Sequence, residues 1–258
     1  MLCRDIMKVI EATYPKHAAL EWDNVGLLVG RTEKEVKKIY VALDATDEVV
    51  EQAVAANVDM LITHHPLLFS PLKKITDEDF IGSRVVKLLQ HDISYYAMHT
   101  NYDVLGMAEL SSAILGLSDT KVLEITDDET KEGIGRVGLL KSEMSLQECC
   151  ELVKERFHLE TVKVFGTLNE KIQRVAISPG SGKHMSELAL AEGAQVLVTG
   201  DIDHHEGLDA VERGLFIIDA GHYGLEHIFI EDVAEFIRKK ILDVCVVKAE
   251  KMHPFHVV

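Results

Sequence analysis

Histidines follow three apolar runs of this 258-residue chain. His64 and His65 follow the run 60–63, His99 follows 93–98, and His222 comes soon after 215–218. In parallel sheets, functional groups collect just past the carboxyl ends of the strands. Neighbours on an extended strand point to opposite faces, so His64 and His65 share a site only if the chain turns there. Pro66 favours that turn, and the alternative is that the pair caps a following helix.

Two of these histidines have a carboxylate four residues further along the chain. Asp103 follows His99, and Glu226 follows His222. If a helix begins near His222, both of its groups lie on one face about one turn apart, which suits a shared metal ion. The segment 99–103 is more ambiguous, because Asn and Asp also form ordinary turns.

Three imidazoles and two carboxylates are thereby available as metal ligands: His64, His65, Asp103, His222 and Glu226. Mixed nitrogen and oxygen ligands suit Zn, Mn, Fe, Co or Ni and do not suit calcium. Five protein ligands are too many for one open tetrahedral zinc site but fit two ions that share a carboxylate.

The elements that must position these residues alternate between buried strands and amphipathic helices. The expected strands are 39–43, 60–63, 93–98, 162–165, 175–177, 196–199 and 216–218. The expected helices are 47–56, 79–90, 146–157, 184–191 and 224–239, and Ser145 with Glu148 forms a capping-box pattern. This alternation predicts an α/β protein with mostly parallel sheets flanked by helices.

The chain also repeats a pattern of strand, helix and strand, which ends once at His64-His65 and again at Gly200-Asp201. We therefore predict two related α/β halves with the metal site between them. The alternative is that any two such units look alike. The expected halves are 1–125, completed by 224–258, and 126–223, and the polar segment 120–136 is the expected passage between them.

Four blocks of the sequence, in this order, resemble signature blocks of one known family: Glu21–Leu27, Thr63–Pro66, His99–Asp103 and Gly221–Glu226. They look like those of the GTP cyclohydrolase 1 type 2 homologue family, also called the Nif-three-like dinuclear-metal proteins. The resemblance runs from Met1 to the C-terminus and is to the short form, without an inserted domain.

This resemblance implies two α/β halves, a two-metal site and assembly into a homohexameric ring. It implies that the five residues named above are the metal ligands, with Glu226 bridging. It also implies hydrolytic opening of the guanine imidazole ring of GTP with release of formate. The expected cofactors are two divalent transition-metal ions per chain, Zn, Mn or Fe.

Residues beside these ligands are candidates for other roles. Trp22 and Asn24 are expected to bind substrate, with a core tryptophan and a plain turn as the alternative. His99 is the candidate catalytic residue, because a histidine beside metal-bound water can transfer protons.

Two other motifs have simpler explanations. The loop Gly180–Gly182 lacks the residues of a Walker A motif, so we expect a plain turn, with phosphate binding as the weaker alternative. Asp201, Asp203, His204 and His205 are explained by a polar helix start, with metal binding as the weaker alternative. His253 and His256 are expected to be solvated or at an interface.

Composition limits the class of protein. Lys and Arg number 27 and Asp and Glu 43, for a net charge of −16, which disfavours binding to nucleic acid or to anionic membranes. No apolar run is long enough to span a membrane, and the start lacks the apolar core of a signal peptide. The four cysteines include the adjacent Cys149 and Cys150, which favours a reduced cytoplasmic environment.

The leading prediction is a dinuclear-metal-dependent hydrolase that acts on a nucleotide, with GTP ring opening as the named candidate. The alternatives are a metal-dependent phosphoesterase and a non-catalytic metal-binding or partner-binding assembly protein. The expected partners are further copies of the chain and a small-molecule nucleotide.

Overall fold

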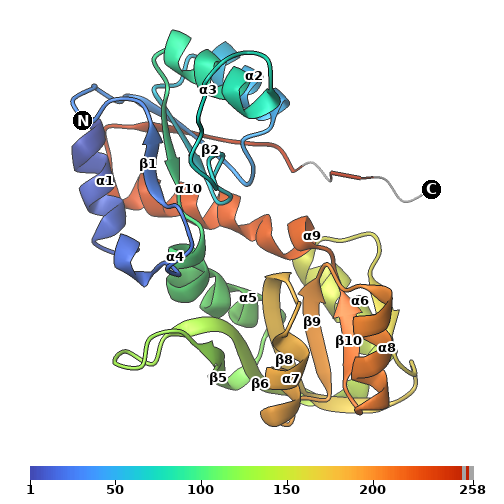
Figure 1. The fold of residues 1–258 in the computed structure, drawn as a ribbon. Helices are drawn as coiled ribbons and strands as arrows, with labels where there is room; N and C mark the ends of the chain where they lie inside the picture. Colours follow the sequence, from blue (N-terminus) through green and yellow to red (C-terminus); the bar gives the residue numbers. More distant parts are fainter. Residues whose placement is uncertain (252–253, 256–258) are drawn as a thin grey trace. The chain divides into compact units, whose positions relative to one another are not determined.

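The computed structural model describes residues 1–251 and 254–255, so the interpretation of His253 and His256 lies outside the described residues. The described chain forms two compact units (Figure 1). The first holds Met1–Tyr102 and residues 229–251, and the second holds Asp103–Ile228 and residues 254–255. The boundaries of these units differ from those of the predicted halves: the first unit ends its N-terminal part at Tyr102 and not at 125.

The first unit is built on a sheet with the strand order β1-β4-β3-β2-β11. Its strands are β1 (Gly26–Val29), β2 (Lys38–Ala42), β3 (Met60–Thr63), β4 (Ser94–Ala97) and β11 (Cys245–Lys248). β1 pairs antiparallel with β4, and the other pairings are parallel. Ala42 pairs with Thr63, which pairs with Ala97, so three strands end at the same level. The residues that follow them therefore lie at one edge of the sheet.

Helices pack on this sheet, and β3 and β4 are buried along their whole length. The helices are α1 (Cys3–Glu11), α2 (Asp47–Ala55), α3 (Phe80–Gln90), the short α4 (Thr100–Tyr102) and most of α10 (Ile228–Lys240), with the 3-10 turn η1 (Lys16–Ala18). Apolar residues of α2 and α3, such as Val50 and Leu88, pack in one core with Leu61 and Tyr95 of the sheet.

The second unit has a sheet with the strand order β5-β6-β8-β9-β10-β7. Its strands are β5 (Ser118–Ile125), β6 (Gly133–Ser145), β7 (Lys163–Phe165), β8 (Lys171–Ser181), β9 (Val196–Gly200) and β10 (Phe216–Asp219). β8, β9 and β10 are parallel, whereas β5, β6 and β7 pair antiparallel with their neighbours. Pairing in this sheet is thus more mixed than the predicted mostly parallel arrangement.

Helices of the second unit complete its layers. They are the π-helical turn η2 (Asp103–Met107), α5 (Ala108–Leu115), α6 (Leu146–Phe157), α7 (Met185–Ala191), α8 (His204–Glu212) and α9 (His222–Glu226). The predicted capping box is confirmed, since Ser145 and Glu148 cap the start of α6 reciprocally. Ala189 of α7 and Ala210 of α8 pack in one core with Leu197 and Ile217 of the sheet.

The prediction for 120–136 is wrong: this segment belongs to the antiparallel hairpin of β5 and β6 and is no passage between halves. β5 lies at the edge of the sheet, where half of its positions are exposed and only Leu123 is buried, so its polar residues can face water. The expected α/β class and its two halves are confirmed, and the expected strands are present with ends shifted by a few residues. No helix of the described residues is long and apolar enough to cross a lipid bilayer.

Candidate metal centre

Three histidines of the first unit lie together at the level edge of its sheet. His64 and His65 follow β3, His99 follows β4, and one ring nitrogen of each lies within 4.8 Å of the others. We call these residues the histidine triad. The amides of His64 and His65 both donate to the carbonyl of Leu43, at 3.1 and 3.0 Å. The chain therefore turns at this pair, as the sequence predicted, and this turn brings both imidazoles to the same side as His99.

Each imidazole of the triad is held through its Nδ1 atom. The partner of His64 is the carbonyl of Met98 at 2.8 Å, that of His65 is Asp44 Oδ1 at 2.7 Å, and that of His99 is Asp23 Oδ1 at 2.9 Å. A carbonyl or carboxylate oxygen only accepts, so each Nδ1 carries a proton and Nε2 is the ring nitrogen that can coordinate a metal ion. This is the arrangement in which histidines of metal sites are oriented and made more basic.

Asp23 is the more deeply buried of the two carboxylate partners, with a side chain that is 0% exposed against 45% for Asp44. Its Oδ2 accepts from the amide of Thr100 at 2.9 Å and from Thr100 Oγ1 at 2.5 Å, at the start of α4. Burial acts to raise the pKa of Asp23, but the hydrogen bonds from His99 and Thr100 outweigh it and lower the pKa to about 2. Asp23 is therefore an anion at neutral pH.

The second unit holds its own group of ligands. His222 and Glu226 lie one turn apart on α9, with 3.0 Å between His222 Nε2 and Glu226 Oε2. A carboxylate oxygen of Asp103, the first residue of η2, lies within 4.8 Å of one of Glu226. Glu226 is only 3% exposed, and this burial is costly for a carboxylate unless a cation or donors face it.

His222 is oriented in the same way as the triad, since its Nδ1 lies 2.7 Å from Asp201 Oδ2. Burial acts to lower the pKa of His222, but Glu226 and Asp201 outweigh it and raise the pKa to about 9. At neutral pH the imidazole is thus protonated, and a metal ion that binds Nε2 displaces this proton.

At Gly180 the backbone passes too close to Glu226 to leave room for a side chain. Gly180, in the loop-forming end of β8, has φ +80, and a Cβ atom there would lie 2.6 Å from Glu226 Oε1. Glycine therefore lets the backbone of β8 approach the carboxylate. This close approach fixes Glu226 on one side.

The remaining candidates occupy different surroundings. Trp22 is 62% exposed and its ring meets that of His99 edge-on at 5.9 Å, so it is no core residue. Asn24 donates from Nδ2 to the carbonyl of Leu68 at 2.5 Å. The Gly180–Gly182 segment continues β8 to Ser181, and α7 starts only at Met185.

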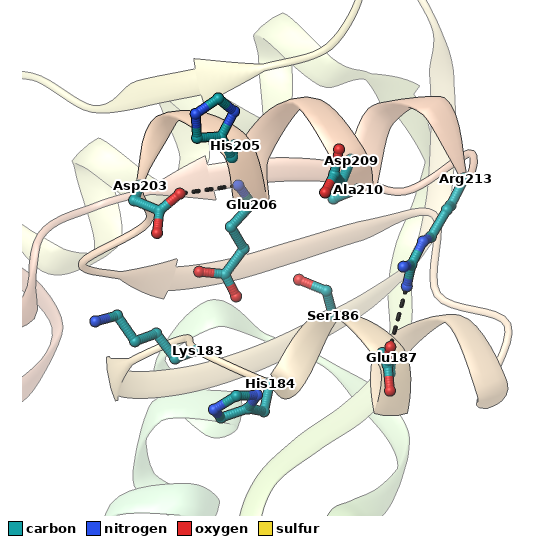
Figure 2. Close-up of a pocket in the computed structure, with 10 residues that line it drawn as sticks. All are labelled: Lys183, His184, Ser186, Glu187, Asp203, His205, Glu206, Asp209, Ala210 and Arg213. Atoms are coloured by element: carbon teal, nitrogen blue, oxygen red, sulfur yellow. Dashed lines mark hydrogen bonds and ion pairs between the residues drawn. The ribbon is translucent and has the colours of Figure 1, made fainter.

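The polar cluster before α8 is mainly a helix start, as predicted. Figure 2 shows Asp203 beside the first turn of α8, where its Oδ1 accepts from the amide of Glu206 at 2.9 Å. Asp201 is the exception, because it orients His222. His204 and His205 take part in no three-residue metal-binding group of the described chain.

Sequence reasoning missed the three orienting carboxylates Asp23, Asp44 and Asp201. Asp44 follows β2, and Asp201 follows β9, so the rule that pointed to the histidines also applied to them. Asp23 follows no strand and carries no such signal. The donor chemistry of the whole set, imidazole nitrogen and carboxylate oxygen, fits first-row transition metals.

Comparisons with known proteins agree over nearly the whole chain. Residues 1–254 match the model of a family described as Duf34/NIF3 (NGG1p interacting factor 3). A Lactococcus lactis protein named GTP cyclohydrolase 1 type 2 homolog is 38% identical over 263 residues, 99% of each chain. A protein of the same name from Clostridium perfringens is 35% identical over 243 residues, 93% of each chain. The crystal structure of a Bacillus cereus protein related to NIF3 has a TM-score of 0.90 at 27% identity and covers 100% of this chain and 99% of that one.

Proposed function

The chain belongs to the Duf34/NIF3 family, and from this premise we propose that it is a hydrolase with two divalent transition-metal ions per chain. In this proposal the ions, Zn, Mn or Fe, are held by His64, His65, Asp103, His222 and Glu226, with Glu226 shared. The substrate is a nucleotide, and opening of the guanine imidazole ring of GTP with release of formate is the candidate reaction.

One observation carries the proposal: the histidines at both groups of ligands have Nδ1 bound to an oxygen acceptor. This holds for His64, His65 and His222, at 2.8, 2.7 and 2.7 Å. Surface histidines rarely need such partners, whereas metal ligands nearly always have them, because the partner fixes the tautomer that coordinates. The names of the relatives support the choice of GTP as the first substrate to test.

The chemistry of each residue follows from its surroundings. When bound, a pair of divalent ions lowers the pKa of bound water and polarises the substrate. His99 transfers protons at Nε2, because Asp23 remains ionised and holds the proton on Nδ1. Trp22 and Asn24 bind the substrate beside His99.

Product analysis tests the proposal. Purified chain is loaded with Zn, Mn or Fe and incubated with GTP, and formate, pterin precursor and free phosphate are measured. Formate with a pterin precursor supports the proposed reaction. Free phosphate alone would instead establish a phosphoesterase, and no product with any metal would favour a non-catalytic metal-binding protein.

We also propose a homohexameric ring in the cytoplasm, on the basis of the resemblance to the family. Light scattering is expected to give a mass about six times the 28.8 kDa of one chain. A mass near that of one chain at micromolar concentration would contradict this assembly.

A further inference from the structure

A pocket of about 420 Å³ lies in the first unit, beside the histidine triad. It is formed by the segment that contains Trp22, Asp23 and Asn24 and by the loop after His65, and its lining also includes Leu68, Phe69, Ser70, Pro71, Leu72 and Ile75. Two rings of the lining pack edge-to-face with the imidazole of His99. The distance between ring centroids is 5.9 Å for Trp22 and 5.5 Å for Phe69, and the interplanar angles are 74° and 86°. The pocket is therefore next to the group to which we assign proton transfer.

The pocket has a mixed lining, in which six of the nine residues are apolar, and three of these apolar side chains are largely exposed. The exposed fraction is 62% for Trp22, 51% for Phe69 and 51% for Ile75. Single exposed apolar side chains are ordinary, but several that line one pocket mark a binding surface. A flat ligand that covers these side chains would remove their surface from water and would stack on the aromatic rings of Trp22 and Phe69.

One polar side chain of the lining, that of Asn24, can orient a ligand in the pocket. Asn24 donates from Nδ2 to the carbonyl of Leu68 at 2.5 Å, and since a carbonyl only accepts, this bond fixes which way the amide is turned. Asn24 Oδ1 is then the amide's acceptor, and it accepts no hydrogen bond from the described residues. It suits the N–H group of a ring.

Charge argues against a phosphate in this pocket. Among the described residues, no lysine, arginine or histidine is part of the lining. The carboxylate of Asp23 is 0% exposed and occupied by His99 and Thr100, and its negative charge repels anions. The ligand part that fits is planar, uncharged and able to donate from nitrogen.

We infer that this pocket binds the planar nitrogen heterocycle of the substrate against Trp22 and Phe69, with Asn24 Oδ1 accepting from a ring N–H. The inference rests on the proposed function, because it assigns the ring end of the same substrate. It predicts that recognition depends on the base and that the phosphates of a nucleotide lie outside this pocket.

Trp22 is the only tryptophan of the chain and so reports directly on the pocket. Metal-loaded full-length protein is titrated with guanosine, an uncharged probe, while tryptophan fluorescence is recorded. We expect a saturable change with guanosine and none with ribose 5-phosphate. Phe69→Ala should weaken guanosine binding by about 5- to 150-fold, the usual range for loss of one stacking ring.

Phe80→Ala is the matched control, since Phe80 is 61% exposed and lies outside the lining. Its guanosine affinity should equal that of the parent. If Phe69→Ala does not fold, Phe69→Leu keeps apolar volume without the ring and should also weaken binding. The inference is overturned if guanosine gives no saturable change, if ribose 5-phosphate binds as well, or if the Phe69 variant that folds binds like the parent.

Metal content of the same samples separates this inference from the proposed function. A chain that holds two ions but does not respond to guanosine would overturn the inference and leave the metal centre standing. A chain that binds guanosine with the expected variant pattern but holds no metal would support the pocket and contradict the proposed hydrolase.

Discussion

Replacement of Asp23 by Asn should destabilise the chain strongly at neutral pH and weakly in acid. The carboxylate accepts from His99 Nδ1, the Thr100 amide and Thr100 Oγ1. An amide group cannot accept all three, because its NH₂ would face a donor. Loss of buried hydrogen bonds to a charged group costs about 2–3 kcal/mol each at most, and relaxation of the loop reduces the sum.

The depressed pKa expresses the effect of the same hydrogen bonds as a free energy. The pKa of Asp23 is about 2 in the folded chain against an ordinary value of 3.8. One pKa unit corresponds to about 1.4 kcal/mol, so the ionised carboxylate contributes about 2.5 kcal/mol. Because the folded pKa is the lower one, this stability is fully present above pH 3.8 and is lost as the pH falls towards 2.

Urea unfolding of metal-free parent and Asp23→Asn at pH 6, 4 and 3 measures the effect. The difference in unfolding free energy should be about 2–3 kcal/mol at pH 6 and should shrink below pH 4. Asp77→Asn is the control, since Asp77 is exposed and its variant should match the parent throughout. A difference that does not change with pH, or that the control reproduces, would refute the reasoning.

Three further predictions concern the metal centre. Glu226→Gln should impair loading of both ions, because an amide cannot balance two cations, whereas His204→Ala should not; equal losses by mass spectrometry would contradict this. His99→Ala should lower turnover about 10- to 100-fold or more with unchanged metal content, and loss of metal would make it a ligand. Gly180→Ala and Gly214→Ala both place a side chain at positive φ, but only the first would push against Glu226. Only Gly180→Ala should therefore lower metal content.

The sequence alone was sufficient for the elements that are buried on both faces. β3 and β9 are mostly apolar and buried at every position, as is typical of central strands of a parallel sheet that are covered on both faces. The histidines after β3 and β4 could be picked out from the sequence because the ends of such apolar strands are easy to locate. The start of α6 was predictable because Ser145 and Glu148 act within one turn.

Elements at sheet edges were not predictable in this way. β5 has only one buried position, Leu123, and β6 begins with alternating glycines, which weaken any strand pattern. β6 is also held on its other side by pairing with β8, a contact with a more distant part of the sequence. The acidic composition of this segment therefore suggested a linker where the structure has two strands.

The orientation of the histidines was decided only by tertiary structure. His65 bonds to Asp44 and His222 to Asp201, each 21 residues away, and His99 bonds to Asp23, 76 residues away. Asp44 and Asp201 reach their histidines because neighbouring parallel strands end at the same level. Asp23 reaches His99 because its loop folds onto the start of α4. Residue types and local spacing thus determine which groups can bind metal, whereas strand register and loop packing decide which nitrogen each imidazole presents.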